Sequence, residues 1–523
     1  MSVLNRNLPG VLIVLVTLIV AACAPQRPPQ TSDDDYPLPA AKEVFTAGYE
    51  SIVERYIEIV APGQFAMEGL HGLGSIDPAI TIETDESDII VKFSGTVADR
   101  IAAPADDDAE GWAELTVHIT ALGRQHSMEM RRASAEKIYE AVFDGILSNL
   151  DIYSRYAGSK EAKKNRAKRS GFGGIGVRFH IVKNLPQVTF VMPDTPAQKA
   201  GILKGDRITH ADETDLGGLK QAQISEKLRG PIHSEIILQI ERKGESAPLV
   251  VKLERVHIVP DTVSYGHKNG IVYLKISTFN QRTARNLLNK LKKARADLGD
   301  TIKGIILDMR GNPGGLLKQS IQVADLFLAQ GRISETRGRH PDSLQSYDAG
   351  GRDMAYGRPV VVLVDGKSAS AAEVAAAALQ DRGRAVIIGT SSFGKGTVQT
   401  VIRLPNEGEI TLTWSRLIAP SGFVLHGLGV YPTICTSSID GNRIDGEAII
   451  ARALNERIKT AAVMEGWRRT SFQEKTQRQE LRAFCPPERR KLQLDSKVAE
   501  ALLNSKTLYA RTLNLSASAA AAR

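Results

Sequence analysis

Three stretches in the second half of the chain are apolar at consecutive positions rather than at alternate ones. They lie near 304–308, 359–364 and 385–389, and a loop rich in glycine or serine follows each of them. Helical spacing joins them, with one helix ending at Gly331 and another near Gln380. Continuous apolar strands joined by helices predict a parallel sheet that is covered on both faces, so the predicted fold class is α/β.

The ends of these strands predict where the chemistry lies. In open parallel sheets, ligands bind beyond the carboxyl ends of the strands. The loops after the three strands carry the glycine-rich run 311–315, Ser370 and Lys395. We therefore expect these groups to meet on one rim of the sheet.

The first 170 residues have a different pattern, with amphipathic helices and short alternating runs. Helical spacing covers 41–60 and 133–151, whereas "DIIVKFSG" and "AELTVHIT" alternate in places and predict short strands. The basic run "KEAKKNRAKRS" at 160–170 is interpreted as a solvated linker, and contact with anionic lipid or nucleic acid is the alternative. This part of the chain is predicted to be a separate N-terminal region.

The segment 171–256 has its own sequence of strand, turn and helix signals. "GFGGIGVRF" is a glycine loop that leads into a strand, and "TPAQKAGILKGDRIT" is a short helix, a glycine turn and a strand. These runs resemble a PDZ domain, which adds a peptide as a strand to a sheet edge and holds its terminal carboxylate with loop amides. The resemblance implies a groove along Val177–Ile181 that faces Ile224 and Leu228. The expected carboxylate-binding amide nest consists of Gly173, Gly174, Ile175, Gly176 and Val177, and a tight turn without a ligand is the alternative.

Two glycine motifs match nucleotide-binding spacings without the context that those loops require. Gly389, four residues and then Gly394-Lys395 fit a phosphate-binding loop, but Gly396 stands where a Ser or Thr would reach Mg²⁺. "GFGGIG" at 171–176 precedes the strand-like "VRFHIV" and not a helix. The sequence therefore does not predict a nucleotide enzyme.

Ser370 and Lys395 together suggest nucleophilic catalysis. A serine at a helix N-terminus lies where free N–H groups favour negative charge, although a plain helix cap is the commoner role. Lysine acts as a base only when it is neutral, and moving its pKa from about 10.4 to near 7 costs roughly 4–5 kcal/mol of differential solvation. The apolar "AVIIG" and Phe393 can impose that desolvation, so Lys395 is predicted to be a buried general base and not a solvated loop lysine.

Further groups are candidates for supporting this pair. If 395–404 is extended, Lys395 and Gln399 share one face, so the Gln399 amide oxygen is a candidate to orient the amine; a routine strand glutamine is the alternative. The backbone N–H of Ala371, with one from Gly314 or Gly315, would form an oxyanion hole.

The runs "LDMRGNPGGLL", "DGKSASAAEVAAAALQDRGRAVIIG" and "SFGKGTVQ" resemble the carboxyl-terminal processing (tail-specific) protease family, and the similarity spans about 140 to 435. The resemblance implies a crotonase-like α/β core, Ser370 as nucleophile and Lys395 as base, 25 positions apart in the sequence, and no metal or cofactor. It also implies supporting roles for Glu373, Asp381 and Gln399. Ser392, Thr433 and "FVLH" (423–426) depart from the family pattern, and the last two are expected to alter the specificity pocket.

The N-terminus predicts export. The apolar run 11–20 is too short to span a bilayer and leads to "AAC" with Cys23, which resembles a bacterial lipoprotein signal. An ordinary signal peptide cut near Ala22, or an N-terminal anchor, is the alternative. Residues 24–40 are expected to form a flexible tether. The remaining pair, Cys435 and Cys485, is compatible with one disulfide or with two buried thiols.

The leading hypothesis is a periplasmic, membrane-anchored serine endopeptidase that recognises protein C-termini. A non-catalytic PDZ scaffold is one alternative, and a Ser/His hydrolase that uses His426 or His340 is another; both histidines are expected in exposed loops. The net charge of +8 is spread along the chain, and no nucleic-acid partner is expected. The regions that match no known pattern are candidates for binding an adaptor protein. The predicted division is 1–23 signal peptide, 24–40 tether, 41–160 N-terminal region, 171–256 PDZ domain, 257–435 Ser/Lys protease core and 436–523 helical extension.

Overall fold

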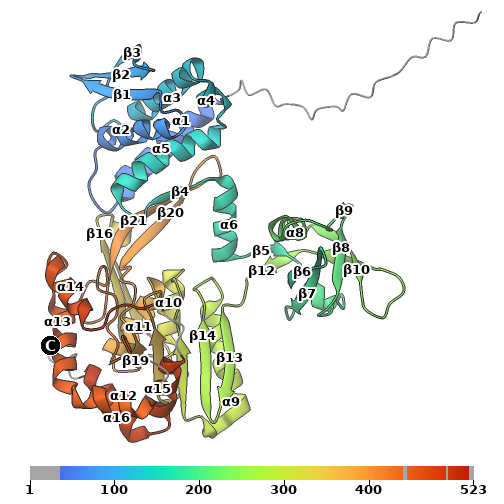
Figure 1. Ribbon diagram of the computed structural model, residues 1–523, viewed down its shortest axis with the longest axis vertical. Helices are drawn as coiled ribbons and strands as arrows, with labels where there is room; N and C mark the ends of the chain where they lie inside the picture. Colours follow the sequence, from blue (N-terminus) through green and yellow to red (C-terminus); the bar gives the residue numbers. More distant parts are fainter. Residues whose placement is uncertain (1–35, 440–444, 490–492, 518–523) are drawn as a thin grey trace, which may run out of the picture.

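The computed structural model describes residues 36–439, 445–489 and 493–517 of the 523-residue chain. Cys23 and the predicted signal peptide lie outside the described residues. Figure 1 shows an N-terminal helical unit, a small β-rich unit that projects to one side, and an α/β core along which the C-terminal helices pack. Among the described helices, none is both long enough and apolar enough to cross a membrane.

The core contains a six-stranded sheet in the order β13-β14-β15-β18-β19-β22, in which only β13 runs antiparallel to its neighbour. Alternate residues of β18 pack into two apolar clusters, Val360 and Val362 on one face and Val361 and Leu363 on the other. The α/β prediction is thus confirmed, and burial on both faces explains the continuous apolar runs. The strands are β13 (Val263–Lys268), β14 (Ile271–Ile276), β15 (Gly304–Asp308), β18 (Val360–Val364), β19 (Val386–Gly389) and β22 (Ile434–Cys435).

Helices from two different parts of the chain cover the two faces of this sheet. The first face is covered from within the core by α9 (Thr283–Leu298), α10 (Leu317–Asp325) and α11 (Ala371–Asp381). The second face is covered by α12 (Gly446–Asn455), α15 (Leu494–Leu503) and α16 (Lys506–Ala517) of the C-terminal extension (445–517). The other two helices of the extension, α13 (Arg457–Arg469) and α14 (Lys475–Ala483), pack with the apolar cluster of the first face. The extension is therefore part of the folded core.

A disulfide ties the C-terminal extension to the core sheet. Cys435, at the end of β22, is bonded to Cys485, which follows α14. The structure thus contains the bridge that the sequence left open against two free thiols.

A second sheet joins the core to the N-terminal unit. Its order is β17-β16-β21-β20, and β4 also pairs with β21. The strand that follows Lys395 is β20, so this sheet borders the candidate site. The strands are β4 (Arg155–Ala157), β16 (Gly331–Gly338), β17 (Gln345–Ala349), β20 (Thr397–Arg403) and β21 (Glu409–Ile418).

The N-terminal unit packs helices against a three-stranded meander. The run "AELTVHIT", predicted as a strand, lies inside α3, so that prediction was wrong. The buried Trp112, Leu115, Thr116 and Ile119 follow helical spacing, and the Asp108 carboxylate caps the helix start. The elements are α1 (Leu38–Arg55), α2 (Pro62–Gly72), β1 (Ile80–Asp85), β2 (Asp88–Phe93), β3 (Thr96–Ala102), α3 (Ala109–His126), α4 (Met128–Arg132) and α5 (Ala135–Leu150).

The basic run at 160–170 is a helix and not a linker, which corrects the sequence interpretation. Helix α6 (Ser159–Ser170) directs Arg166 and Arg169 to the buried Glu409 of β21, at N–O distances of 3.0 and 2.8 Å. Two guanidinium groups on one buried carboxylate fix the helix to the second sheet. Periodicity missed this helix because almost none of its surface is apolar.

The β-rich unit is a five-stranded antiparallel path, β11-β10-β8-β7-β6, with β9 paired to β8. Among the described residues, hydrogen bonds join it to the rest of the chain only near its two ends, where β5 pairs with β12. Its elements are β5 (Phe172–Gly174), β6 (Val177–Val182), β7 (Leu185–Val191), α7 (Pro196–Lys199), β8 (Arg207–Ala211), β9 (Thr214–Asp215), α8 (Gln221–Leu228), β10 (Glu235–Glu241), β11 (Leu249–Glu254) and β12 (Val256–Ile258).

Candidate active site

Ser370 occupies the N-terminal end of α11 in a strained backbone conformation. Its φ of +54° and ψ of −115° are rare for a residue with a Cβ atom. Its Oγ faces the Glu373 N–H as in a capping box, but it makes no cap hydrogen bond. Ser370 is half-buried, whereas every residue of α11 is buried. The hydroxyl is thus held at the head of a rigid helix without being used as an ordinary cap.

The glycine loop after β15 packs directly against Ser370. A Cβ atom on Gly314 would lie 2.8 Å from Ala369 O and 3.0 Å from Ser370 Cβ. One on Gly315 would lie 2.1 Å from Phe279 O. Neither position has room for a side chain, so glycine is required for this approach.

Two backbone N–H groups remain available beside Ser370. In the described chain neither Gly315 N–H nor Ala371 N–H donates a hydrogen bond, whereas Gly314 N–H donates to Asn312 Oδ1 at 2.9 Å. The predicted oxyanion donors therefore reduce to Gly315 and Ala371, because the Gly314 N–H is already satisfied. One free donor at the N-terminus of α11 and one on the glycine loop suit a developing negative charge.

Lys395 lies on the loop between β19 and β20 and is half-buried. Loss of hydration lowers the pKa of its ammonium group and the nearby Arg155 lowers it further, while the carboxylates of Asp151 and Glu373 oppose both effects. Its Nζ lies 4.8 Å from the centroid of the Tyr153 ring. No hydrogen bond joins it to Ser370 among the described residues. Burial thus lowers the pKa of the Lys395 amine, and the side chain rests on the face of Tyr153 in this structure.

The carboxylate of Glu373 links the backbone of the serine to the backbone of the lysine. It is fully buried and accepts the N–H of Ser370 at 2.7 Å, of Gly394 at 2.6 Å and of Lys395 at 2.9 Å, as well as the Ser392 hydroxyl. Burial raises its pKa, and these hydrogen bonds oppose the rise. Glu373 therefore fixes the distance between the two loops that carry the candidate pair.

Asp381 lies at the opposite end of α11 and has a structural role. It pairs with the buried Arg468 of α13 at 2.9 Å and accepts both the N–H and the hydroxyl of Ser421. Thr433 is also buried, and its hydroxyl accepts a hydrogen bond from the Gln380 amide. This contact gives Thr433 a role in core packing, and its effect on the specificity pocket stays a prediction.

Gln399 does not contact Lys395, so the predicted orienting role is not observed. Its amide nitrogen donates to Thr397 Oγ1 at 2.8 Å and to Thr413 Oγ1 at 3.4 Å. The strand register shifts between Val398 and Gln399, but the Gln399 side chain still reaches that of Thr397, two residues earlier on the same strand. The Gln399 amide nitrogen is thus bonded to two threonine hydroxyls, and no hydrogen bond joins Gln399 to Lys395 in the described chain.

Two histidines that were expected in exposed loops are instead half-buried. His340 contacts Glu54 at 3.2 Å, and neither histidine is hydrogen-bonded to Ser370. His426 packs edge-on against Tyr153, with 5.8 Å between ring centroids, and its Nδ1 has no partner in the described chain. Sequence reasoning missed Tyr153 and His426 as neighbours of the lysine. Both lie within the span of about 140 to 435 that resembles the protease family, and His426 belongs to the "FVLH" run that departs from its pattern.

The β-rich unit offers an open sheet edge. Strand β6 is the outermost strand, and the N–H groups of Ile175 and Gly176 donate no hydrogen bond in the described chain. Gly173 and Gly174 instead belong to β5, which pairs with β12, so they differ from the predicted continuous nest. A Cβ on Gly176 would lie 2.3 Å from Thr195, which explains this glycine. The edge and the two free amides suit an added peptide strand.

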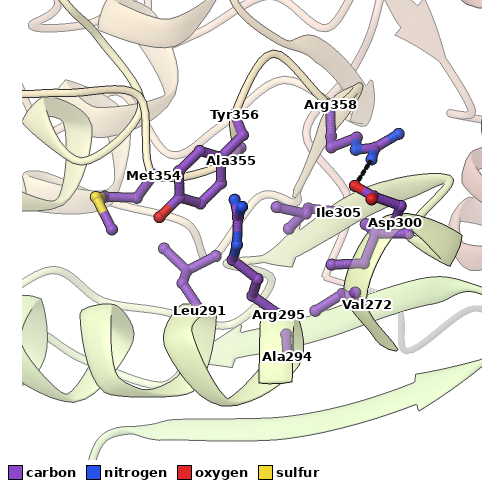
Figure 2. Close-up of a pocket in the computed structure, with 12 residues that line it drawn as sticks. Val272, Leu291, Ala294, Arg295, Asp300, Ile305, Met354, Ala355, Tyr356 and Arg358 are labelled. Carbon is purple, nitrogen blue, oxygen red and sulfur yellow. Dashed lines mark hydrogen bonds and ion pairs between the residues drawn. The ribbon is translucent and has the colours of Figure 1, made fainter. Parts of the chain in front are cut away.

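A cavity of about 240 Å³ lies away from these residues, beside the C-terminal end of α9. Figure 2 shows Arg295 close to the ring of Tyr356, at 3.9 Å from its centroid, and Arg358 paired with Asp300 at 3.0 Å. None of the residues predicted from the sequence lines this cavity.

Two parts of the chain match known protein families. Residues 270–436 match the sequence model of Peptidase family S41, and residues 173–253 match that of the PDZ domain. A carboxy-terminal-processing protease of Bartonella bacilliformis is 40% identical over 301 residues, which cover 57% of this chain and 69% of that protein. A probable CtpA-like serine protease of Staphylococcus aureus is 30% identical over 308 residues, which cover 58% of this chain and 61% of that protein.

Among solved structures, the photosystem II D1 C-terminal processing protease aligns with 75% of this chain and 92% of its own, at 21% identity and a TM-score of 0.39. The identity to the Bartonella relative and the two domain matches confirm the resemblance noted from the motifs. The chain belongs to peptidase family S41, the carboxy-terminal-processing serine proteases, and it carries a PDZ domain.

Proposed function

We propose that the protein is an exported endopeptidase that captures substrate proteins by their C-termini and cleaves them with a Ser370–Lys395 pair. The observation that carries this proposal is the buried Glu373 carboxylate, which binds the backbone of both residues at once. A surface serine and a surface lysine would not need such a connection. The strained φ of Ser370 and the lowered pKa of Lys395 support the same assignment.

The reaction begins when the neutral amine of Lys395 takes the proton of the Ser370 hydroxyl. The Ser370 oxygen then attacks the peptide carbonyl carbon, and the carbonyl oxygen becomes negative. The N–H groups of Gly315 and Ala371 stabilise that oxygen because they have no competing acceptor. For this step the Lys395 amine must leave the face of Tyr153 and reach Ser370.

The second half of the reaction reverses the proton transfer. The Lys395 ammonium protonates the leaving amine, and the C–N bond breaks to give an acyl-enzyme on Ser370. Water then attacks the ester carbonyl while Lys395 takes a proton from it. The ester C–O bond breaks as the Lys395 ammonium returns a proton to the Ser370 oxygen, which regenerates the serine hydroxyl and releases the new carboxyl group. Glu373 keeps the loops that carry Ser370 and Lys395 at a fixed distance during both halves of the reaction.

A non-catalytic PDZ scaffold would bind peptides but would have no activated serine. We expect a serine-reactive phosphonate probe to label the wild-type protein at Ser370, as located by peptide mass mapping. Ser154, which is buried and donates its hydroxyl to Asp151 at 2.6 Å, serves as an internal comparison and should stay unlabelled. Absence of labelling at Ser370 in the folded protein would favour the scaffold.

The PDZ domain is proposed to hold the substrate terminus on β6, with its carboxylate at the N–H groups of Ile175 and Gly176. Amidating that carboxylate removes the charge, so a peptide amide should bind the full-length Ser370→Ala protein at least roughly 10-fold more weakly than the acid. Calorimetric titration of the two peptides measures this difference. Equal affinity for acid and amide would rule out terminal recognition.

Export and membrane attachment are proposed from the sequence alone. Cys23 would become the acylated first residue of the mature protein, and residues 24–40 would tether the folded part to a bacterial membrane. A periplasmic location fits a chain whose structure contains a disulfide.

A further inference from the structure

The C-terminal extension contacts two loops that flank Lys395. We define the lysine loops as residues 391–396 and 424–429. They are joined to each other, because Gly427 N–H donates to Gly394 O at 2.9 Å and Val430 N–H donates to Ser392 Oγ at 2.7 Å. Figure 1 shows α13 and α14 of the extension along one side of the core. A movement of either loop would therefore move the backbone that carries Lys395.

Two arginines of α14 bind the backbone carbonyls of these loops. Arg482 donates to Leu428 O and, at 3.1 Å, to Ser392 O, so it bridges the two loops. Arg478 donates to Val424 O at 2.7 Å and to His426 O.

The arginines are the sole donors to these carbonyls. Within the described chain, none of the carbonyls of Ser392, His426 and Leu428 accepts a hydrogen bond from any other group. Truncating an arginine would leave buried or half-buried carbonyls without a donor, which is unfavourable. The conformation of the lysine loops thus depends on side chains that lie outside the matched protease segment, 270–436.

The electrostatic setting of the two arginines is also unusual. Neither forms an ion pair in the described chain, although arginine generally finds a carboxylate when it is this far from water. Burial lowers the pKa of Arg478 to about 10 and also lowers that of Arg482, while the negative Glu373 favours the charged form of Arg482. Both remain cationic at neutral pH, and their hydrogen bonds go to carbonyl groups.

A disulfide fixes the chain just beyond the C-terminal end of α14. Cys485 lies three residues after Arg482 and forms the disulfide with Cys435, at the end of the core strand β22. Trp467 of α13 adds a hydrogen bond from its indole N–H to Gly429 O at 3.1 Å. The chain is therefore fixed just beyond the C-terminal end of α14, and α13 makes its own contact with the lysine loops.

We propose that the C-terminal extension is a positioning element of the active site, in which Arg482 and Arg478 hold the lysine loops so that Lys395 can reach Ser370. This inference rests on the proposed function and deepens it. Neither arginine touches the substrate or the reacting atoms in this scheme; both act through the backbone around Lys395.

The test compares Arg482→Met and Arg478→Met with Arg469→Met in the full-length protein. Methionine keeps an apolar stem of similar length but removes the hydrogen-bond donors. Arg469 is the control, because it lies on α13 of the same extension and its exposed side chain pairs with Glu465. We expect kcat for cleavage of an unstructured protein to fall by about 100-fold in either α14 variant, because a displacement of about 1 Å costs that much, with KM within about twofold. Arg469→Met should behave as wild type.

The pH profile separates a positioning role from a general loss of stability. Loosened loops admit water to Lys395, so its pKa should rise and the acid limb of kcat/KM should move to higher pH. Arg155, Asp151, Glu373 and Tyr153, which also surround the amine, are unchanged in both variants. An unfolding defect would reduce the amount of active enzyme without moving that limb.

Two further variants keep the test decisive if a methionine variant does not fold. Arg482→Lys retains one cationic donor and should recover part of kcat, and the Cys435→Ser, Cys485→Ser double variant should lower kcat with the arginines intact. Wild-type kcat and an unmoved acid limb in folded Arg482→Met or in the double variant would overturn the positioning role. An inactive wild-type protein would instead contradict the proposed function.

Discussion

Lys395→Met is expected to lose between about 100-fold and 10⁴-fold of kcat for cleavage of an unstructured protein, which is the range that general acid–base catalysis contributes. The loss follows because methionine has a stem of similar length but cannot take the Ser370 proton. Ser370→Ala should lose more, on the order of 10⁶-fold, because the nucleophile and the covalent route disappear together. Single-turnover assays at a fixed substrate concentration measure both losses.

Lys395→Arg is the informative companion variant. Arginine keeps the positive charge and the length of the side chain but does not deprotonate near neutral pH, so it should be as inactive as methionine. Lys367→Met is the matched control, since Lys367 is exposed on the loop just before Ser370. Substantial activity in Lys395→Arg would contradict the role of a neutral amine.

The same assignment fixes the sign of the pH dependence. A base works only when it is deprotonated, so kcat/KM should rise with pH through the pKa of Lys395. Burial lowers that pKa, so the rise should be centred below the ordinary value for lysine of about 10.4. The rise should be absent from the residual activity of Lys395→Met.

Glu373→Ala is expected to lower the free energy of unfolding by roughly 3–5 kcal/mol. Four buried donors lose their acceptor, each at a cost of about 1–3 kcal/mol, and relaxation and water recover part of the total. Activity should fall as well, because the backbones of Ser370 and Lys395 are no longer joined. Urea unfolding with an unchanged slope, together with kcat of the folded fraction, measures both effects.

Two further variants, Glu373→Gln and Glu447→Ala, show whether the effect comes from the buried carboxylate itself or from removing any acid in the first turn of a helix. Glutamine keeps one acceptor oxygen but brings an NH₂ group against the remaining donors, so its stability should lie between wild type and Glu373→Ala. Glu447 is an exposed acid in the first turn of α12, and its loss should change stability by less than about 0.5 kcal/mol. A Glu373→Ala protein as stable as wild type would show that the buried carboxylate does not connect the loops.

The sequence alone predicted the features that depend on the burial of strand residues. Continuous apolar runs predicted β15, β18 and β19, and the rule that ligands bind at strand ends placed the glycine loop, Ser370 and Lys395 near one rim. The run 113–120, which lies inside α3, was predicted as a strand because its apolar residues fit both an alternating and a helical spacing. Helix α6 was missed because it has no apolar face. Two ion pairs with Glu409 hold it in place instead.

The finer geometry of the site depends on contacts that no local pattern encodes. The position of Gln399 is set by a shift in strand register and by two threonine hydroxyls, one of them on another strand. Arg478 and Arg482 bind loops more than fifty residues earlier, through backbone carbonyls that every residue possesses. Such contacts leave no mark on spacing or composition, so only the folded chain reveals them.

The Cys435–Cys485 bond closes a ring that contains α12, α13 and α14. A protease is exposed to its own cutting activity and to that of its neighbours. A single nick of the chain anywhere between residues 436 and 484 would leave both fragments linked through sulfur, so the helix that carries Arg482 would stay attached to the core. A nicked molecule would separate into two pieces only after reduction.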